Sequence, residues 1–169
     1  MALIVEDGSI VANANSYISL VDARAFADSR GIVISTDDTI AEQQLLKSMD
    51  YLEAQRARYQ GEKTEPLTQE LQFPRENMQI DCVDFPSDEI PKELWQAQVY
   101  LAVEVESGVE LMPTTEGGFV TFEKVGPLET KYSEKIGTNQ QPSFQSVNVL
   151  LDALFYPCGQ KFALSSVRV

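Results

Sequence analysis

Apolar residues recur at helical spacing in the first third of the chain, directly after a polar start signal. Residues 19–22, Ser-Leu-Val-Asp, have the pattern of a capping box, in which a serine oxygen accepts from free N–H groups of the first turn. They predict a helix that ends at Gly31. The apolar side of this helix is expected to carry Val21, Ala25 and Phe26.

A second, longer helix is predicted after the same kind of signal at residues 39–42, Thr-Ile-Ala-Glu. Leu45, Met49 and Leu52 follow at spacings of four and three, which places them on one face of that helix. The helix is expected to end before Gly61.

An irregular segment separates the second helix from a third. It covers residues 62–89, contains three prolines, and is expected to be anchored in the core by Leu71 and Phe73. The third helix is predicted over 91–107, and Pro91 suits its first turn. A helix that is apolar all round must be buried, either inside a large domain or between subunits. A domain of this size can bury one such helix centrally, but an oligomer is expected to bury it more easily. The residues that nearly encircle this helix are Leu94, Trp95, Ala97, Val99, Tyr100, Leu101, Ala102, Val103 and Val105.

After the third helix the period of the pattern changes to two. Residues 119–132 predict a β-hairpin around Gly126 and Pro127, with Glu and Lys on both strands, where opposite charges could pair. The segment 147–154 predicts a short helix, and the alternating segment 161–169 predicts a last strand.

These elements predict an α+β fold that is mainly helical: a bundle of three to four helices with a β-hairpin and a C-terminal strand. A chain of 169 residues favours one domain. We expect residues 1–134 to form a helical body that includes the hairpin. Residues 135–169 are expected to supply a loop, a short helix and a C-terminal docking strand. The opening residues 1–5 are expected to be a strand or arm that the rest of the fold, or a neighbouring subunit, holds.

The charge of the chain disfavours tight binding to nucleic acid. Asp and Glu number 26 against 13 Lys and Arg, which gives a net charge of −13 and a pI near 4.3. Proteins that bind DNA usually present clustered cations to the phosphates, because released counterions drive the affinity. Here residues 56–58, Arg-Ala-Arg, are the only local concentration of positive charge.

The residue types needed for common catalytic chemistry are missing. Histidine is absent, which removes the usual general base at neutral pH and the commonest metal ligand. The sequence has no CxxC pair and no glycine-rich phosphate loop. The acidic residues Asp81, Asp84, Asp88 and Glu89 lack the ligand spacing of a calcium-binding loop. We therefore predict no enzyme, and no catalytic, metal or cofactor site.

Export signals and membrane segments are not evident in the sequence. Residues 1–5 lack the basic start and the roughly 7–15 apolar residues of a secretory signal, and no segment approaches the ~20 apolar residues of a membrane helix. We expect a protein made and kept in a cytoplasm. Cys82 and Cys158 are then expected to be buried free thiols, with a disulfide as the lesser alternative.

Several segments, taken in order, resemble one family of small proteins from the morphogenesis clusters of tailed phages and prophages. They are ALIVEDG at 2–8, NANSY at 13–17, DYLE at 50–53, TQELQFPR at 68–75, IP at 90–91 and EKVGPL at 123–128. Such proteins are often labelled DnaT-like single-stranded-DNA-binding proteins. By gene neighbourhood and predicted shape they are similar to head–tail adaptors, which form dodecameric rings beneath the portal.

The resemblance implies two different functions. The first is a structural adaptor in the virion neck, a homo-oligomeric ring between the portal protein and a downstream stopper or tail component, with packaged DNA passing through its lumen. The second is a single-stranded-DNA-binding replication protein, which needs aromatic platforms within a basic groove. Candidate rings for such platforms are Tyr17, Tyr51, Tyr59, Tyr100 and Tyr132, although core packing is the commoner use of such rings. The first function is the expectation; a monomeric regulator that binds a host protein is a third alternative.

The adaptor interpretation predicts two sets of contact residues, and neither involves a cofactor or a membrane. The predicted subunit interface consists of Trp95, Val99, Leu101, Phe119, Phe122, Val125, Leu128 and Tyr132. The predicted portal-docking residues are Val149, Leu150, Phe155, Phe162, Leu164, Val167 and Val169. For the C-terminal run, an internal edge strand is an equal alternative.

Overall fold

A computed structural model describes residues 2–112, 122–125, 128–131 and 143–158. The chain divides into two units, residues 1–111 with 143–169, and residues 112–142, and each is described by itself. The fold is α+β and mainly helical, as predicted. The helices of the first unit are α1 (Leu20–Arg30), α2 (Asp38–Ala54), α3 (Lys92–Glu106) and α4 (Gln145–Phe155).

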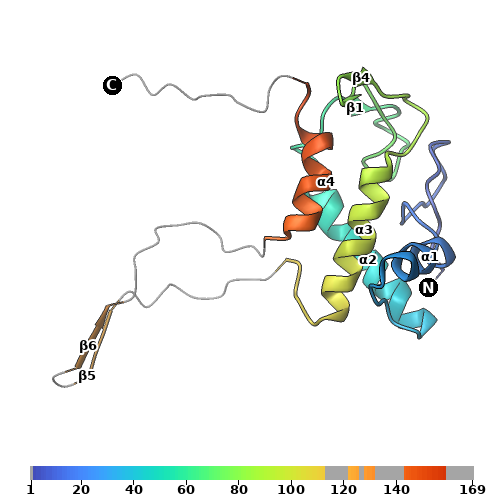
Figure 1. The fold of residues 1–169 in the computed structure, drawn as a ribbon. Helices are drawn as coiled ribbons and strands as arrows, with labels where there is room; N and C mark the ends of the chain where they lie inside the picture. Colours follow the sequence, from blue (N-terminus) through green and yellow to red (C-terminus); the bar gives the residue numbers. More distant parts are fainter. Residues whose placement is uncertain (1, 113–121, 126–127, 132–142, 159–169) are drawn as a thin grey trace, which may run out of the picture. The chain divides into compact units, whose positions relative to one another are not determined.

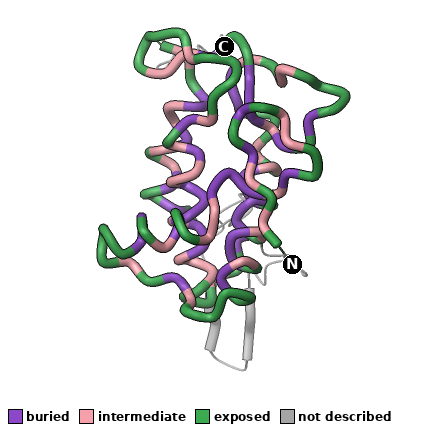
Figure 2. The backbone as a smooth tube through the Cα atoms, turned by 90° about the vertical axis from the view of Figure 1, so that its right-hand side faces the viewer, coloured by how far each residue is buried: buried purple, intermediate pink, exposed green. Residues whose placement is uncertain are grey.

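The first unit is built around α3. This helix contacts α2 along one side and α4 along another, whereas α1 makes fewer contacts and packs against α2 (Figure 1). Buried residues follow the inward sides of these helices, and exposed residues concentrate in the loops (Figure 2).

Two short strand pairs organise the segment between α2 and α3. β1 (Glu62–Lys63) pairs with β2 (Arg75–Glu76), and β3 (Gln79–Ile80) pairs with β4 (Val83–Asp84), both antiparallel. The sequence predicted an irregular segment here, because strands of two residues are too short to show a period. Its predicted anchors are confirmed, since both Leu71 and Phe73 are buried.

The second unit contains the predicted hairpin. β5 (Phe122–Val125) pairs antiparallel with β6 (Leu128–Lys131). The register places Lys124 opposite Glu129, which is the arrangement of positions that a pair of opposite charges across the two strands requires. The remaining residues predicted for this hairpin, 119–121, 126–127 and 132, lie outside the described residues.

The start signal of α1 is confirmed, but of the three residues predicted for its apolar side only Phe26 is buried. The Ser19 hydroxyl accepts from the N–H of Asp22, and Gly31 ends the helix at φ 64°. Val21 and Ala25 are exposed. The buried side is formed by Ala23, Phe26 and Ala27, because these small and aromatic residues fit against α2 and α3 in one core cluster.

The second helix begins two residues earlier than its predicted signal. Asp37 is the cap, and its carboxylate accepts from the N–H of Ile40 at 3.1 Å. An aspartate at this position satisfies a free N–H as well as a threonine does. The predicted face is confirmed, because Leu45, Met49 and Leu52 are all buried.

The all-round apolar character of α3 is satisfied within its own chain. Leu94, Ala97 and Leu101 belong to a cluster shared with α2, α4 and the irregular segment. Val99 and Ala102 belong to a second cluster, which is shared with α1 and α2. The faces of α3 that carry these five residues are therefore buried inside the domain, which is one of the two alternatives that the sequence left open.

A glutamine in the centre of the first unit joins three segments that are distant in sequence. Gln98 is fully buried on α3, and its Oε1 accepts from the N–H of Tyr17 at 3.0 Å. Its Nε2 donates to the Ser16 hydroxyl at 2.9 Å and to the Leu45 carbonyl at 3.2 Å. Gln98 thus ties α2 and α3 to the chain just before α1.

The first residues are held by the fold, as predicted, with a contribution that the sequence analysis missed. Val5 forms a parallel β-bridge with Ser16. Glu6 is buried, and its carboxylate shapes the following loop by accepting from backbone N–H groups. The donors are Gly8 at 2.9 Å, Ile10 at 3.0 Å and Val11 at 2.9 Å.

The two cysteines are bonded to each other, which corrects the expectation of buried free thiols. Cys82 and Cys158 form a disulfide, with their Cα atoms 4.9 Å apart, and both residues are exposed. Their separation of 76 positions in sequence gave no indication of this proximity, because it depends on how α4 packs beside β3.

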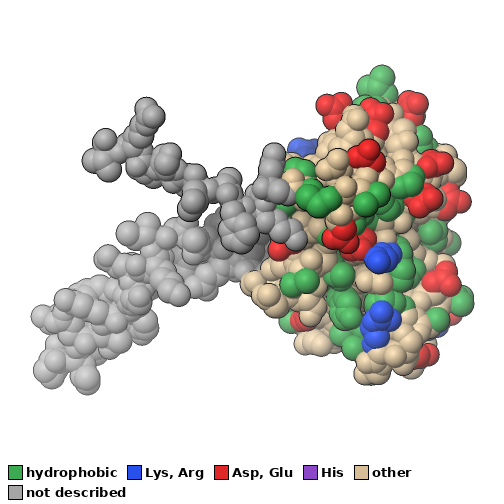
Figure 3. All heavy atoms as spheres, turned by 45° about the horizontal axis from the view of Figure 1, so that its top comes forward, with side chains coloured by type: hydrophobic (Ala, Val, Ile, Leu, Met, Phe, Trp, Pro, Cys, Tyr) green, Lys and Arg blue, Asp and Glu red, His purple; other side chains and the backbone are tan. Residues whose placement is uncertain are grey.

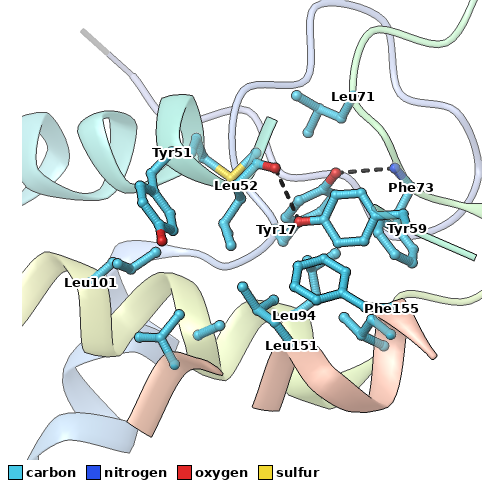
Figure 4. Packing of buried hydrophobic residues seen from close by; sticks show 14 of the residues in the cluster. Tyr17, Tyr51, Leu52, Tyr59, Leu71, Phe73, Leu94, Leu101, Leu151 and Phe155 are labelled. Carbon is cyan, nitrogen blue, oxygen red and sulfur yellow. Dashed lines mark hydrogen bonds between the residues drawn. The ribbon is translucent and has the colours of Figure 1, made fainter. Parts of the chain in front are cut away.

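A carboxylate lies at the edge of the aromatic core. Glu53 Oε1 accepts from the Tyr17 hydroxyl at 3.1 Å and from the N–H of Gln72 at 3.0 Å. The Tyr17 hydroxyl in turn accepts from the N–H of Phe73 at 3.1 Å (Figure 4). Burial raises the pKa of Glu53 above its ordinary value, and the hydrogen bonds only partly oppose this effect.

This raised pKa predicts a pH-dependent contribution to stability. An acid that is harder to ionise in the folded state stabilises the fold fully below its unfolded pKa, about 4.3, and loses that contribution as the pH rises. Glu53→Gln keeps an oxygen acceptor but cannot titrate. Wild type should therefore lose unfolding free energy relative to Glu53→Gln between about pH 4 and 7, as urea titrations at several pH values would measure. A difference in unfolding free energy between wild type and Glu53→Gln that does not change with pH, or that changes in the opposite direction, would contradict a raised pKa of Glu53.

Candidate interaction surface

The aromatic rings that a single-stranded-DNA binder would offer are used in the core. Tyr17, Tyr51 and Tyr59 are all buried. Tyr59 packs edge-on against Phe73, with ring centroids 5.0 Å apart, and donates its hydroxyl to the Leu52 carbonyl (Figure 4). Tyr100 is partly buried against Phe26, and Tyr132 lies outside the described residues. The core role expected as the commoner one is confirmed for the three buried tyrosines.

Three arginines of the first unit contact groups of their own chain. Arg75 is buried and donates to the carbonyls of Gln60 and Gly61, at 2.6 and 2.7 Å. Arg24 bonds Asp38 and the carbonyls that follow α1. Arg58 lies over the Phe155 ring, 4.0 Å from its centroid. On the face drawn in Figure 3, acidic side chains are spread widely and the basic ones stand singly.

A groove beside Trp95 is the main apolar hollow associated with a predicted contact residue. Its volume is about 370 Å³, and it is formed where the first residues of the chain, the start of α1 and the first turns of α3 meet. The lining residues are Val5, Tyr17, Ile18, Ser19, Asp22, Phe26 and Trp95. We call it the Trp95 groove.

Trp95 contacts both of the core clusters into which the buried residues of the first unit are divided. The indole packs against both core clusters and stands edge-on to Phe26, with ring centroids 5.2 Å apart. It is only partly buried, so one part of the ring remains available to a neighbour. Aromatic residues of this kind, fixed on one side and open on the other, are common anchors at protein interfaces.

The structure separates the predicted interface residues. Trp95 lines the groove, whereas Val99 and Leu101 are fully buried in their own chain and cannot reach another subunit. These two are corrected to core residues, because α1, α2 and α4 cover the sides of α3 on which they lie. Phe122 and Val125 lie on β5 and Leu128 on β6. Phe119 and Tyr132 lie outside the described residues.

The predicted portal-docking residues also divide. Val149 is 62% exposed, Leu150 is partly buried, and Phe155 is buried against Tyr59 and is therefore corrected to a core residue. The structure adds Tyr156, which is exposed and lies seven positions after Val149. Val149 and Ala153 are four positions apart on α4, a spacing that the sequence shows, whereas Tyr156 is the extended residue that follows the helix. We call these three residues the α4 stripe.

The remaining docking residues, Phe162, Leu164, Val167 and Val169, lie outside the described residues, as does the predicted last strand.

Apolar side chains form much of both surfaces. Within the described ranges, no group of three or more Cys, Asp and Glu side chains is arranged to hold a metal ion. None of the helices described is both long and apolar enough to cross a membrane.

Comparison with known proteins gives one match. A family model described as "Putative DnaT-like ssDNA binding protein" matches residues 1–169. Neither the search of curated proteins nor the search of solved structures finds a match. The family description corresponds to the label carried by the resembling proteins, and it favours the second of the two functions considered, binding to single-stranded DNA. It does not mention an adaptor.

Proposed function

We propose that this chain, which belongs to the family described as putative DnaT-like ssDNA-binding proteins, works as a structural adaptor that assembles through protein contacts. In this proposal, copies form a ring in the neck of a tailed-phage virion. The ring sits between the portal protein and a downstream stopper or tail component. Packaged DNA passes through without being held.

The observation that carries the proposal is the use of the aromatic rings and cations inside the first unit. Tyr17, Tyr51 and Tyr59 are buried, and Arg75 is bonded to backbone carbonyls. A single-strand binder needs such rings and cations at its surface. With a net charge of −13, the chain would repel phosphates, which suits a channel wall that DNA must slide past.

The apolar surfaces that remain supply two different contact faces. A closed ring needs head-to-tail contacts, in which one face of each copy meets a different face of the next. The Trp95 groove and the α4 stripe are distinct surfaces built on different helices. The kind of assembly is taken from the sequence resemblance to phage morphogenesis proteins, and so are its partners and its place in the virion.

Single-stranded-DNA binding is the second candidate function, and the full-length family match favours it. If it is correct, the binding surface must use groups other than the buried tyrosines. Arg56 and Arg58, with the partly buried Tyr100, are the groups of the first unit that such a surface would draw on. The two functions make opposite predictions for protein assembly and for DNA affinity.

Replacing Val149 with lysine is predicted to reduce assembly at least tenfold, because a charge on the α4 stripe must lose water when the stripe is covered. Val33→Lys is the matched control, since Val33 is 67% exposed, lies after α1, and belongs neither to the Trp95 groove nor to the α4 stripe. Native mass spectrometry of each variant, alone and with the portal protein of the same phage or prophage, would measure the assembled fraction. Wild type that never assembles, or Val149→Lys that assembles fully, would count against the proposal.

A further inference from the structure

The disulfide joins the end of α4 to a turn whose local structure is unusual for cysteine. Cys82 is the second residue of the two-residue turn between β3 and β4, and Cys158 follows the end of α4 by three residues. Both turn residues have positive φ, 51° at Asp81 and 67° at Cys82. Hairpin turns of this type favour glycine at the second position, because a side chain is disfavoured there. A cysteine in that position indicates a use for its sulfur.

The two cysteines are brought together by contacts that do not depend on the bond. Gln60 Nε2 donates to the Gln79 carbonyl at 3.1 Å and to the Ala153 carbonyl at 3.0 Å. The Gln60 N–H donates to the Leu154 carbonyl at 3.0 Å. Gln60 therefore clamps β3 to the end of α4 on its own, and the thiols of a reduced chain would remain neighbours.

Both cysteines are accessible to small reagents. Each of the two residues is exposed, although most structural disulfides lie within a core. Thiol–disulfide exchange requires that a thiolate approach one sulfur of the bond, so exposure permits the reaction. A cytoplasm holds such pairs reduced, and an oxidising environment closes them.

We propose that Cys82 and Cys158 form a reversible thiol–disulfide exchange site whose reaction partners are small thiols and disulfides. When the bond closes, the two cysteine thiols give up two protons and two electrons to a small disulfide such as oxidised glutathione, which leaves as two thiols. When it opens, two small thiols reverse the step. The closed bond fixes residues 156–158 beside the β3–β4 turn. This inference does not depend on the proposed adaptor function.

The test places the purified full-length protein in glutathione buffers of graded redox ratio, followed by alkylation and mass spectrometry. Each wild-type molecule should carry either no free thiol or two free thiols, and neither cysteine should retain glutathione. Cys158→Ser and Cys82→Ser should each take up one glutathione. Cys82→Gly keeps the turn in a favourable conformation and should leave Cys158 to accept one glutathione.

Hydrogen exchange supplies the structural readout. On reduction, the amide of Tyr156, whose N–H donates to the Asp152 carbonyl at 3.2 Å, should exchange about tenfold faster, while amides buried in α2 keep their rates. Wild type that retains a glutathione, a bond that forms between two chains, a bond that opens only in denaturant, or equal exchange rates at Tyr156 in both states would overturn the proposal.

Discussion

Replacing Phe73 with alanine is expected to lower the free energy of unfolding by about 3–5 kcal/mol, as for other fully buried aromatic residues. The ring is fully buried and stands edge-on to Tyr17 and Tyr59, at centroid distances of 6.2 and 5.0 Å. Its removal leaves a cavity between the irregular segment and α4. It also removes the partner around which both tyrosine rings are arranged.

Urea unfolding followed by circular dichroism would measure this loss. Leu67→Ala is the matched control, because Leu67 lies in the same irregular segment and is 98% exposed. The control should change stability by less than about 0.5 kcal/mol. If Phe73→Ala is as stable as the control, the ring does not hold the core. The tyrosines beside it would then be free to serve another purpose.

Replacing Gln98 with leucine is expected to cost about 1–3 kcal/mol although leucine is apolar and similar in size. The change leaves the buried N–H of Tyr17 without its acceptor. It also removes one of the two donors to the Ser16 hydroxyl, which keeps the N–H of Ile18 at 3.3 Å. Each buried polar group that loses its partner costs about 1–3 kcal/mol. The wild-type glutamine therefore stabilises the fold through hydrogen bonds that leucine cannot make.

Gln43→Leu gives the comparison for this change. Gln43 is exposed on α2, so the same substitution there alters helix propensity and surface polarity without breaking a buried network. Unfolding of both variants in urea would separate the two effects. A Gln98→Leu protein at least as stable as wild type would show that packing, rather than this network, joins α2 and α3 to the chain before α1.

The helices could be predicted from local signals, and their orientation could not. Ser19, Gly31 and Pro91 mark helix ends by chemistry that acts within one turn, and the structure confirms all three. Val21 and Ala25 were assigned to the wrong side because a helix pattern with few large residues fits more than one face. Which side of α1 is buried depends on α2 and α3, which lie elsewhere in the sequence.

The residues predicted for the subunit interface show the same limit of a local sequence pattern. The apolar pattern of α3 identifies residues that must lose water, but it does not say whether the same chain or another copy covers them. Val99 and Leu101 prove to be covered by the chain itself, while Trp95 remains partly open. Gln98 and the Cys82–Cys158 bond escaped prediction for a related reason. Each joins positions far apart in sequence, and no local pattern encodes such a pairing.

In the proposed function, the protein acts through contact with other proteins and does not bind nucleic acid. Fluorescence anisotropy of a labelled single-stranded oligonucleotide, titrated with this protein at about 0.15 M salt, tests that claim most directly. We predict no saturable binding. Saturable binding with sub-micromolar affinity would contradict the proposed function. A logarithm of the affinity that falls linearly with the logarithm of the salt concentration would show that the protein binds the phosphates.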